Sequence, residues 1–410
     1  MRVKHVVFIV LFILILLVFN QVFLDTFSKA NFYFSNQSYY SQEEVSPQKL
    51  YDKTWKVIAK DFYEPSLNHQ DWNRWKNRYQ GKLKTDEDAK VAIETMVASL
   101  NEPYTRFMSK KDFEDLVTSV TSKIYGIGVN IYSNSGKIEI FNVIPSTPAD
   151  FAQLKQGDTI IAVNGKDTNG MNVSEVANLV RGPENSVVEL TIMRDGKKLT
   201  KKIKRKEIKI KNVKSSIIDN HIGYIQIVSF MGGTTPNEFM EAIENTKNTD
   251  SLILDLRGNT GGLLDNAVFI ANLFIQQGEI VEIIYRNGHK KSIKANPEQK
   301  QLNKPVVILV NGASASASEI LSGALKDYKK AKLVGKKTFG KGLVQKVVPL
   351  PNQTGVNVTI ARYLTPNGTD INKLGIKPDI EIGNDYDIFL NNSKKDIQLE
   401  TAKEILNAKN

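Results

Sequence analysis

The 410-residue sequence contains no cysteine and only four histidines. Without thiols, the chain has no cysteine nucleophile, no cysteine-ligated zinc and no disulfide. His5 lies in an apolar N-terminal stretch, His69 in a segment with helical spacing, and His221 and His289 in polar turns. The sequence excludes none of the four as a base, yet none has the setting of a catalytic histidine. A serine nucleophile in this chain would therefore call for another base, such as a lysine.

The composition is otherwise that of a globular protein, with 41% hydrophobic and 24% charged residues. A chain of this length predicts two or three domains. The formal net charge is +11, from 55 basic and 44 acidic residues. Such an excess suits a nucleic acid or an anionic surface. We attribute it instead to a generally lysine-rich composition, and we expect no nucleic-acid partner.

A long hydrophobic run lies at the N-terminus. Arg2 and Lys4 precede it, and a helix over residues 6–24 would rise about 28 Å, close to the roughly 30 Å hydrocarbon core of a bilayer. The basic residues favour a cytoplasmic start and an exported remainder. A cleaved signal peptide, with its site near Ser28–Ala30, is the alternative. We expect residues 1–25 to be an uncleaved, single-pass anchor in the cell membrane, with the catalytic part outside the cytoplasm.

Composition and periodicity divide the rest of the chain into five segments. Residues 26–45 are polar and predict a flexible tether. Residues 46–116 carry apolar side chains at helical spacing, which predicts three short helices that support the fold or pair two copies as a homodimer. Short β patterns separated by turn signals fill 117–207 and predict a small β-rich domain. Strands alternate with helices over 208–384, which predicts an α/β core, and 385–410 predicts a tail that forms a short helix.

The segment VGKKTFGKG, residues 334–342, matches the start of a phosphate-binding loop, with Gly335, Gly340 and Lys341 at the required spacing. Two features argue against that interpretation. Position 342 is glycine, where a serine or threonine would be needed to reach the magnesium ion. The sequence that follows, GLVQKVVPLP, predicts a strand, whereas a phosphate loop opens a helix. We therefore expect no nucleotide site, and Lys341 remains available for another role.

A cluster of small residues, LVNGASASASEI, spans 309–320 between a buried strand and a helix. Serine and alanine at such a turn suit close packing and helix capping, which is a purely structural explanation. A serine there would also point into the crevice where α/β folds place their sites, and the helix N-terminus would suit a developing oxyanion. Lys341, between glycines and beside Phe339 and Leu343, has the setting of a buried lysine with a lowered pKa.

Together with DLRGNTGG, these segments resemble the core motifs of the carboxyl-terminal processing proteases, also called tail-specific proteases. The family motifs DLRxNxGG, GSASASEI and TFGKGxVQ correspond here to 255–262, 313–320 and 338–345, with alanine in place of glycine at position 313. The three motifs together are highly specific, and the resemblance covers nearly the whole chain after the hydrophobic run. It implies a serine–lysine dyad. The implied nucleophile, general base and lysine-orienting residue are Ser316, Lys341 and Gln345.

The resemblance also implies an oxyanion hole made of backbone amides. One donor would be the amide of Ala317, at the start of the helix. The other would be a glycine amide, from Gly261 or Gly262. From the residues alone, the glycine-rich segment is equally a tight turn between a strand and a helix, where glycine permits an unusual backbone conformation.

One implied role presents a geometric difficulty. Lys341 and Gln345 would lie about 13 Å apart on an ideal strand, so their side chains would touch poorly. A bend at Gly342 would bring them together. Asp327 is a further candidate by its position in the family, but it lies about 16 Å along the helix from Ser316. We interpret Asp327 as structural.

The β-rich segment resembles a PDZ domain. YGIGVNI, residues 125–131, is similar to the loop that binds the terminal carboxylate of a peptide, and STPADFAQLKQGDTIIAVNG, residues 146–165, strengthens the match. Successive backbone amides in such a loop could form an anion-binding nest. The expected peptide-binding residues are Tyr125, Gly126, Ile127 and Gly128.

These features predict an α/β serine-protease core, α+β overall, with an upstream β-rich PDZ domain and an N-terminal helical segment after a transmembrane helix. The predicted function is a membrane-anchored endopeptidase that recognises protein C-terminal tails and cleaves them through an acyl-enzyme. The expected partners are protein and peptide substrates with free C-termini, and the membrane. We expect no metal and no other cofactor to be required. A catalytically silent PDZ scaffold that binds peptides is the alternative, and the intact Ser316–Lys341 pair argues against it.

Overall fold

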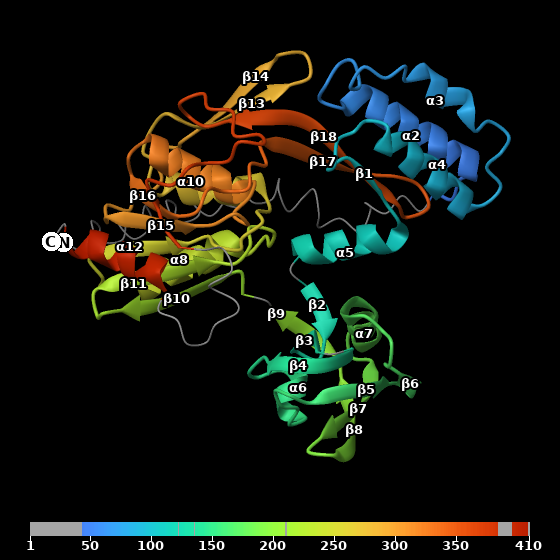
Figure 1. The fold of residues 1–410 in the computed structure, drawn as a ribbon, viewed down its shortest axis with the longest axis horizontal. Coiled ribbons are helices and arrows are strands. Elements are labelled where there is room, and N and C mark those ends of the chain that lie inside the picture. The colour runs from blue at the N-terminus through green and yellow to red at the C-terminus, as the bar shows by residue number, and fades with distance from the viewer. Residues whose placement is uncertain (1–42, 122, 135, 210, 384–395, 409–410) are drawn as a thin grey trace, which may run out of the picture. The chain divides into compact units, whose positions relative to one another are not determined.

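The computed structural model describes residues 43–121, 123–134, 136–209, 211–383 and 396–408. The chain forms two compact units, drawn in Figure 1 with the element labels used below. The second unit is Ser122–Lys211, and the first contains the chain up to Thr121 together with the chain from Asn212 onward. The predicted anchor at 1–25 lies outside the described residues. Within the described ranges, no helix is both long and apolar enough to cross a bilayer.

A six-stranded sheet forms the centre of the first unit. Its strand order is β10–β11–β12–β15–β16–β19, and β11 to β19 run parallel while β10 pairs antiparallel with β11. Every residue of β12 and β15 is buried, as expected of strands that are covered on both faces. The strands are β10 (Val213–Ile218), β11 (Ile222–Ile227), β12 (Ser251–Asp255), β15 (Val306–Val310), β16 (Ala331–Gly335) and β19 (Ile380–Glu381).

Helices cover both faces of this sheet (Figure 1). Leu254 and Ile308 pack in one core with α8 (Thr235–Asn245), α9 (Leu264–Asn272) and α10 (Ala317–Asp327). Their neighbours Ile253 and Leu309 point to the opposite face and pack against α12 (Ile397–Asn407). Successive strand residues alternate between faces, so the continuous apolar runs of β12 and β15 supply both cores. The alternating strands and helices confirm the α/β prediction for this region.

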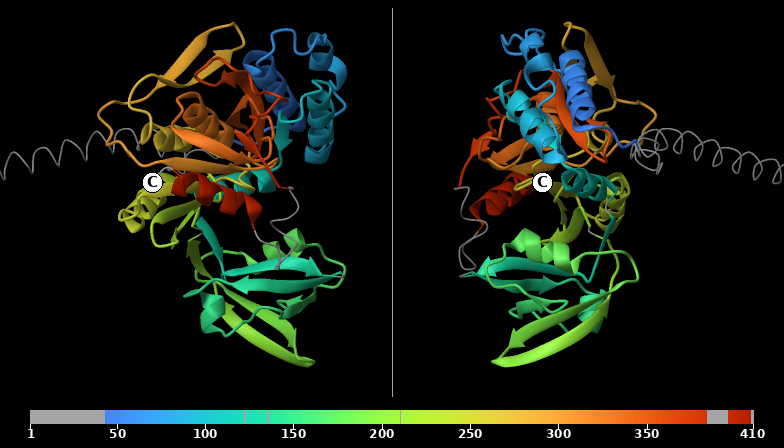
Figure 2. Two further views of the ribbon diagram at one scale, coloured as in Figure 1. Left: turned by 60° about the vertical axis from the view of Figure 1, so that its left-hand side comes forward. Right: turned by 90° about the vertical axis from the view of Figure 1, so that its right-hand side faces the viewer.

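A second sheet of the first unit joins the segment that follows Lys341 to the N-terminal helices. Its order is β1–β18–β13–β14, and β17 also pairs with β18. The strands are β1 (Arg106–Met108), β13 (Glu279–Tyr285), β14 (Lys290–Lys294), β17 (Leu343–Pro349) and β18 (Gly355–Leu364). The helices of the N-terminal region are α2 (Pro47–Asp61), α3 (Asn73–Arg78), α4 (Asp86–Ala98) and α5 (Lys110–Thr121). Figure 2 shows α2 and α4 beside the β17–β18 ribbon.

The N-terminal helices share their core with the β17–β18 hairpin. Leu350, Val356 and Val358 of the hairpin region pack in one buried cluster with Tyr51 of α2 and Ile93 of α4. This shared core explains why the helical region belongs to the same compact unit as the α/β core, although the sequence suggested a separate segment at 46–116. Ser46 begins α2 as its N-cap, followed by Pro47, an arrangement that favours a helix start.

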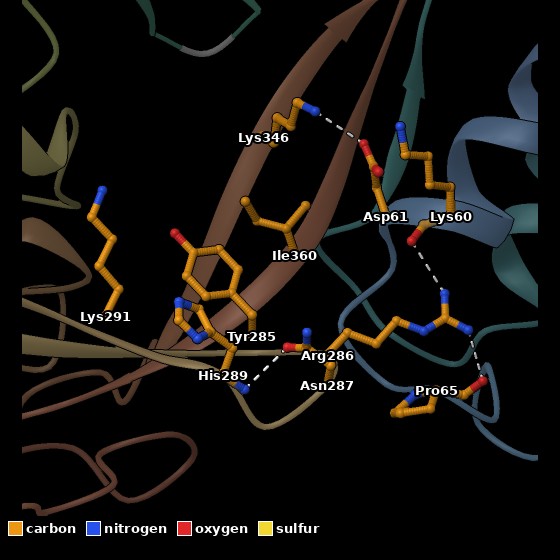
Figure 3. A pocket seen from close by; sticks show the side chains of 10 residues that line it. All are labelled: Lys60, Asp61, Pro65, Tyr285, Arg286, Asn287, His289, Lys291, Lys346 and Ile360. Atoms are coloured by element: carbon orange, nitrogen blue, oxygen red, sulfur yellow. Dashed lines mark hydrogen bonds and ion pairs between the residues drawn. The ribbon is translucent and has the colours of Figure 1, made fainter.

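Polar contacts also attach α2 to the core (Figure 3). Arg286, in the turn between β13 and β14, donates hydrogen bonds to the carbonyls of Ala59 and Pro65 at 2.5 and 2.9 Å. Lys346 of β17 forms an ion pair with Asp61 at 3.0 Å. Arg286, Pro65, Lys346 and Asp61 line an open pocket of about 710 Å³. The N-terminal helices are therefore held to the strands through both apolar and polar contacts.

The second unit is mostly β. Its main sheet has the antiparallel order β3–β4–β5–β7–β8, with β6 paired to β5, and β2 pairs separately with β9. The unit begins at Ser122 and ends at Lys211, rather than spanning 117–207 as expected, because α5 runs to Thr121 and β9 pairs with β2. The elements are β2 (Lys123–Gly126), β3 (Val129–Asn134), β4 (Lys137–Val143), α6 (Pro148–Phe151), β5 (Thr159–Val163), β6 (Lys166–Asp167), α7 (Val173–Val180), β7 (Val187–Arg194), β8 (Lys197–Lys204) and β9 (Lys206–Lys209).

Candidate active site

Two loops meet at one edge of the parallel sheet. β12 and β15 are parallel neighbours, so the loops that leave their carboxyl ends lie side by side, at the usual position of a site in an α/β fold. The first loop contains Gly261, whose φ of 106° favours glycine. A Cβ atom on Gly261 would lie 2.8 Å from Cβ of Ser316, in the second loop. Glycine at this position therefore lets the DLRGNTGG segment approach the candidate nucleophile.

The three serines of the small-residue cluster have different environments. Ser314 Oγ donates to the carbonyl of Leu256 at 2.8 Å, and Ser318 Oγ donates to the carbonyl of Asn259 at 2.9 Å. Both serines are fully buried. The Ser316 hydroxyl, by contrast, donates to no acceptor within the described ranges, and its side chain is partly exposed. The outer two serines therefore attach the two loops to each other, and Ser316 is the serine with an available hydroxyl.

Ser316 is held at the start of α10 in an unusual conformation. Its φ is 56° and its ψ is −114°, a combination that L-residues rarely adopt and that is typical of functional sites. Its amide donates to Glu319 Oε2 at 2.9 Å, and its carbonyl accepts from the amide of Ile320 at 3.0 Å. The start of the helix and the Glu319 carboxylate thus fix the backbone that presents the hydroxyl.

Glu319 connects this helix to the segment that carries Lys341. The Glu319 side chain is fully buried, and its carboxylate accepts four hydrogen bonds. The donors are the amides of Ser316, Gly340 and Lys341 at 2.9, 2.7 and 2.8 Å and the hydroxyl of Thr338 at 2.6 Å. One carboxylate therefore holds the backbone of both candidate catalytic residues. The sequence analysis did not single out Glu319, although it lies inside the 313–320 motif.

Lys341 and Gln345 are in direct contact. Lys341 Nζ donates to Gln345 Oε1 at 3.0 Å. Lys341 precedes β17, which begins at Leu343, and the pairing of β17 with β18 is irregular between Val344 and Gln345. Lys341 and Gln345 therefore do not lie together on one ideal strand, and the separation of about 13 Å expected for such a strand does not apply. This irregularity lies two to three residues after Gly342, where a bend was expected.

Tyr363 brings the two catalytic segments together from β18. Its hydroxyl donates to the carbonyl of Lys341 at 2.6 Å and to the carbonyl of Ser316 at 3.1 Å. Burial raises the pKa of Tyr363 well above its ordinary value, and nearby Glu319 raises it further, so the phenol remains a donor. No hydrogen bond joins Ser316 Oγ to Lys341 Nζ in the described part of the chain. The main chains of Ser316 and Lys341 are held close together, while their side chains form no hydrogen bond with each other.

The environment of Lys341 favours the neutral amine. Burial lowers the pKa of Lys341, because an ammonium loses its hydration there. Arg106 lowers it further, whereas Glu102 and Glu319 act in the opposite direction. The net pKa lies below the ordinary value for a lysine, and a neutral lysine is the form that accepts a proton.

The structure distinguishes the two glycines proposed as oxyanion donors. The amide of Gly261 donates to Asn259 Oδ1 at 2.9 Å and is therefore engaged. The amides of Gly262 and Ala317 have no acceptor among the residues that the structure describes. Phe230 holds the glycine loop on its other side, where its amide donates to the carbonyl of Gly261 at 2.9 Å. Gly262 and Ala317 are thus the available pair.

Asp327 lies near the C-terminal end of α10 and has a local role. Asp327 Oδ2 accepts a hydrogen bond from the amide of Asn367 at 2.9 Å. The structure records no contact of its carboxylate with Ser316 or Lys341.

The second unit contains a groove between β3 and α7 with a volume of about 250 Å³. Gly126, Ile127 and Gly128 lie at this groove, whereas the fourth predicted residue, Tyr125, does not line it, and its carbonyl accepts from Gly182 at 3.4 Å. The sequence analysis missed the helix side of the groove, although its spacing is that of one helix face. The α7 residues that line the groove are Val173, Ala177 and Val180.

Two features of the groove suit an extended peptide. β3 is the edge strand of its sheet, so a peptide strand could pair with it. In the described part of the unit, the amides of Ile127 and Gly128 have no acceptor, and the Gly128 carbonyl accepts from Ile144 at 2.9 Å. Arg181, which follows α7, also lines the groove. The unit therefore presents free amides at one end of an apolar groove.

Comparisons with known proteins agree with both units. The model of peptidase family S41 matches residues 221–382, and the PDZ domain model matches residues 116–193. A carboxyl-terminal-processing protease of Synechocystis sp. is 35% identical over 371 residues, which cover 88% of this chain and 86% of that protein. The carboxy-terminal processing protease CtpA of Bacillus subtilis is 40% identical over 304 residues, which cover 73% of this chain and 65% of that protein.

Two solved structures share the fold of this chain. The photosystem II D1 C-terminal processing protease superimposes with a TM-score of 0.55 at 31% identity, covering 82% of this chain and 93% of that chain. The tricorn protease, at 18% identity and a TM-score of 0.52, shares the fold over 89% of this chain and 37% of its own. The mixed α/β fold with a PDZ domain is thereby confirmed. The chain belongs to peptidase family S41, as a carboxyl-terminal processing serine protease with a PDZ domain.

Proposed function

We propose that this protease cleaves peptide bonds with a Ser316–Lys341 dyad. The observation that carries the proposal is the difference among the three clustered serines, because only the hydroxyl of Ser316 donates to no acceptor in the described residues. Ser316 also begins a helix beside two free amides, and Glu319 and Tyr363 hold the Lys341 backbone to the same place. Burial lowers the pKa of Lys341, which supports its role as the base.

The proposed reaction begins with attack of Ser316 Oγ on the scissile carbonyl carbon, while neutral Lys341 Nζ accepts the hydroxyl proton. The amides of Gly262 and Ala317 would stabilise the resulting oxyanion. Lys341 then donates its proton to the leaving amine as the C–N bond breaks, which leaves an ester on Ser316. Water attacks the ester carbonyl as Lys341 accepts its proton. Lys341 then returns this proton to Ser316 Oγ as the ester C–O bond breaks, and the product acid leaves. Because catalytic hydrogen bonds often form only with substrate present, the unbonded side chains are compatible with this sequence.

A serine-directed fluorophosphonate tests the assignment of the nucleophile. We expect the probe to label the folded protein at a single residue, and peptide mass spectrometry should place the label on Ser316. The Ser314→Ala variant, which removes a neighbouring buried hydroxyl, should keep the label if it folds. Labelling of a different residue, or none in an enzyme that hydrolyses peptides, would contradict the dyad.

We further propose that the PDZ unit selects substrates by their free C-termini. The free amides of Ile127 and Gly128 would bind the terminal carboxylate, and the chain of the peptide would extend the sheet at β3. Val173, Ala177 and Val180 make the groove apolar, so a small apolar C-terminal side chain fits it best. The matched test compares the hydrolysis of one peptide as a free acid and as an amide.

A scaffold that binds peptides without cleaving them is less well supported. Family membership makes the chain a serine peptidase, and the Ser316 and Lys341 side chains are both present at the site. Fluorophosphonate labelling separates the two functions, because a silent scaffold would bind peptides and leave Ser316 unlabelled.

Membrane anchoring through residues 6–24 stays a proposal that rests on the hydrophobic run and the basic residues before it. We expect the full chain to fractionate with membranes and its catalytic part to be accessible to protease from outside. A mature N-terminus near Asn31 would show that the leader is cleaved and would contradict the anchor. Pairing of two copies through the N-terminal helices is a separate prediction, which light scattering of the purified protein tests.

A further inference from the structure

Tyr104, from the loop between α4 and β1, lies against Lys341. Lys341 Nζ is 4.6 Å from the centroid of the Tyr104 ring, within the distance of a cation–π interaction. The ring is partly buried. The sequence analysis found only structural roles in the N-terminal helical segment. The structure places a side chain from that segment next to the amine of the proposed base.

The Tyr104 backbone is held from both sides. Its amide donates to Glu102 Oε1 at 2.9 Å, and its carbonyl accepts from Asn357 Nδ2 at 3.2 Å. Glu102 is buried, and its second oxygen accepts from the Thr105 amide at 2.8 Å and from the Thr359 hydroxyl at 2.8 Å. The loop therefore folds around one carboxylate and is attached to β18.

The same strand holds the ring and the lysine. Asn357 and Thr359 of β18 bind the Tyr104 loop, and Tyr363, farther along β18, binds the Lys341 carbonyl. β1, which follows the loop, also pairs with β18 between Arg106 and Asn357. The position of the ring relative to the amine is thus set by a rigid element of the sheet.

We propose that Tyr104 is a positioning residue for Lys341, whose ring covers the amine, keeps Nζ at Gln345 and excludes water. This inference rests on the proposed Ser316–Lys341 mechanism. An aromatic face attracts the ammonium without offering it a proton acceptor. A carboxylate in the same place would pair with the ammonium and oppose its deprotonation. The ring therefore orients the ammonium by its π face, and it still covers the amine after the proton is lost.

The carboxylates near Lys341 accept hydrogen bonds from groups other than its amine, so the Tyr104 ring is the group that positions the amine. Glu319 faces the lysine backbone from α10, and its two oxygens accept four hydrogen bonds, one from the Lys341 amide and none from Lys341 Nζ. Glu102 lies on the Tyr104 loop and is likewise occupied by donors of its own loop and of β18. Arg106 of β1 and Tyr363 of β18 complete the titratable surroundings. None of the ion pairs found in the described residues includes Lys341.

Three substitutions at position 104 separate the contributions of the ring. Tyr104→Phe keeps the aromatic face, Tyr104→Leu keeps an apolar cover without it, and Tyr104→Ala opens the site to water. The measurement is the second-order rate constant for fluorophosphonate labelling of Ser316, followed from neutral to alkaline pH. Burial raises the pKa of the Tyr104 hydroxyl, and the Phe variant removes its titration altogether. Tyr285→Ala is the matched control, because Tyr285 belongs to the same unit and stacks on His289, at the pocket of Figure 3.

We expect Tyr104→Phe to label within about twofold of wild type, with the same pH dependence. Tyr104→Ala should label about 10 to 100 times more slowly, since a displaced catalytic group costs rate, and its pH midpoint should move up toward the roughly 10.4 of a free lysine. Tyr104→Leu should label about tenfold more slowly, with its midpoint below that of wild type, because leucine excludes water and does not stabilise the ammonium. Tyr285→Ala should match wild type.

Several results would overturn the role of Tyr104. Equal losses in the Phe and Ala variants would assign the effect to the hydroxyl rather than the ring. An unchanged pH midpoint in both Leu and Ala would show that the ring does not control the amine, and the same shift in Tyr285→Ala would show an unspecific effect. If Tyr104→Ala does not fold, the difference in labelling rate and pH midpoint between Tyr104→Phe and Tyr104→Leu tests the role of the ring. Failure of the dyad itself is distinguishable, because Lys341→Ala would then keep the wild-type rate and midpoint.

Discussion

The peptide groove of the PDZ unit and the Ser316–Lys341 site of the protease unit differ in how much of the chain each requires. The groove takes all its residues from Gly126–Ile208, within one small β-rich unit. The proposed catalytic site joins loop 101–105, the glycine loop at 256–263, the start of α10 and the segment 338–345. Buried Glu319 joins the last two of these segments, and buried Glu102 attaches its loop to β18. Substitutions in the groove should therefore affect peptide binding alone. Substitutions in the site should change both the rate of hydrolysis and the stability of the fold.

The largest expected effect is loss of the dyad. Ser316→Ala removes the nucleophile and Lys341→Met removes the amine while keeping the side-chain stem. Each should lower kcat for peptide hydrolysis by at least about 10³-fold, as in other nucleophile–base pairs. The double variant should be no worse than either single variant, since the two groups act as a unit. Hydrolysis and thermal unfolding are measured together to separate chemistry from folding.

Substantial hydrolysis by folded Lys341→Met would contradict the lysine as base. Inhibition of the wild type by a chelator would implicate a metal instead. The Gly128→Ala variant in the other unit sharpens the comparison, because it should retain labelling of Ser316 by a small fluorophosphonate.

A smaller loss is expected when the buried carboxylate of Glu319 is replaced. Glu319→Gln removes the charge and turns an amide NH₂ toward donors that need an acceptor. Loss of a charge-assisted hydrogen bond costs about 1.5–3 kcal/mol, so the free energy of unfolding should fall by that amount. Hydrolysis should fall about 10- to 100-fold, because both catalytic backbones shift. Chemical denaturation and steady-state kinetics measure the two effects.

Glu244→Gln is the control for Glu319→Gln. Glu244 is exposed on α8 and pairs with Lys247, and exposed pairs contribute little to stability. Its unfolding free energy should change by at most about 0.5 kcal/mol. If Glu319→Gln behaved like this surface variant, the carboxylate would not hold the site together.

The smallest effect is expected in the groove. A peptide with a free, apolar C-terminus should bind about tenfold more tightly than the same peptide as an amide, which lacks the charge. Gly128 has a φ of 88°, and a Cβ there would lie 2.3 Å from the Thr147 side chain, so Gly128→Ala should distort the loop and reduce this discrimination. Gly126→Ala, whose Cβ would meet no atom within 4 Å, is the matched control.

The two peptide forms are compared by the KM and kcat of their hydrolysis in wild type and in both glycine variants. Equal processing of acid and amide by the wild type would show that the groove does not read C-termini. Discrimination that survives in Gly128→Ala would move recognition to another surface.

The sequence predicted best what is local in the chain. The motifs that contain Ser316, Lys341 and Gln345 could be matched to the family because each is a short, continuous run of the chain. The α/β core followed from alternating strands and helices in the same way. The β-rich unit extends from Ser122 to Lys211 in the structure, because α5 continues to Thr121 and the β2–β9 pair joins residues far apart.

Contacts between distant segments were not predictable by the same means. Tyr104 reaches Lys341 from more than 200 residues earlier, through hydrogen bonds to β18 that no local pattern encodes. Tyr363 appears in the sequence as one more aromatic residue of a buried strand. Gly261 and Gly262 look alike in the sequence, and only the hydrogen bond from the Gly261 amide to Asn259 separates them. Which atoms remain free depends on the folded arrangement.

The most direct test of the account is the pH dependence of Ser316 labelling in wild type and in Lys341→Met. The reactive form of the lysine is neutral, and burial lowers its pKa, so labelling should be fast above that pKa and fall as the pH drops through it. We predict that the midpoint of the labelling rate in wild type lies below the roughly 10.4 of a free lysine. In Lys341→Met, labelling should be slow and should lack this rising limb of the pH profile. A flat wild-type profile, or the same limb in Lys341→Met, would contradict Lys341 as the base that activates Ser316.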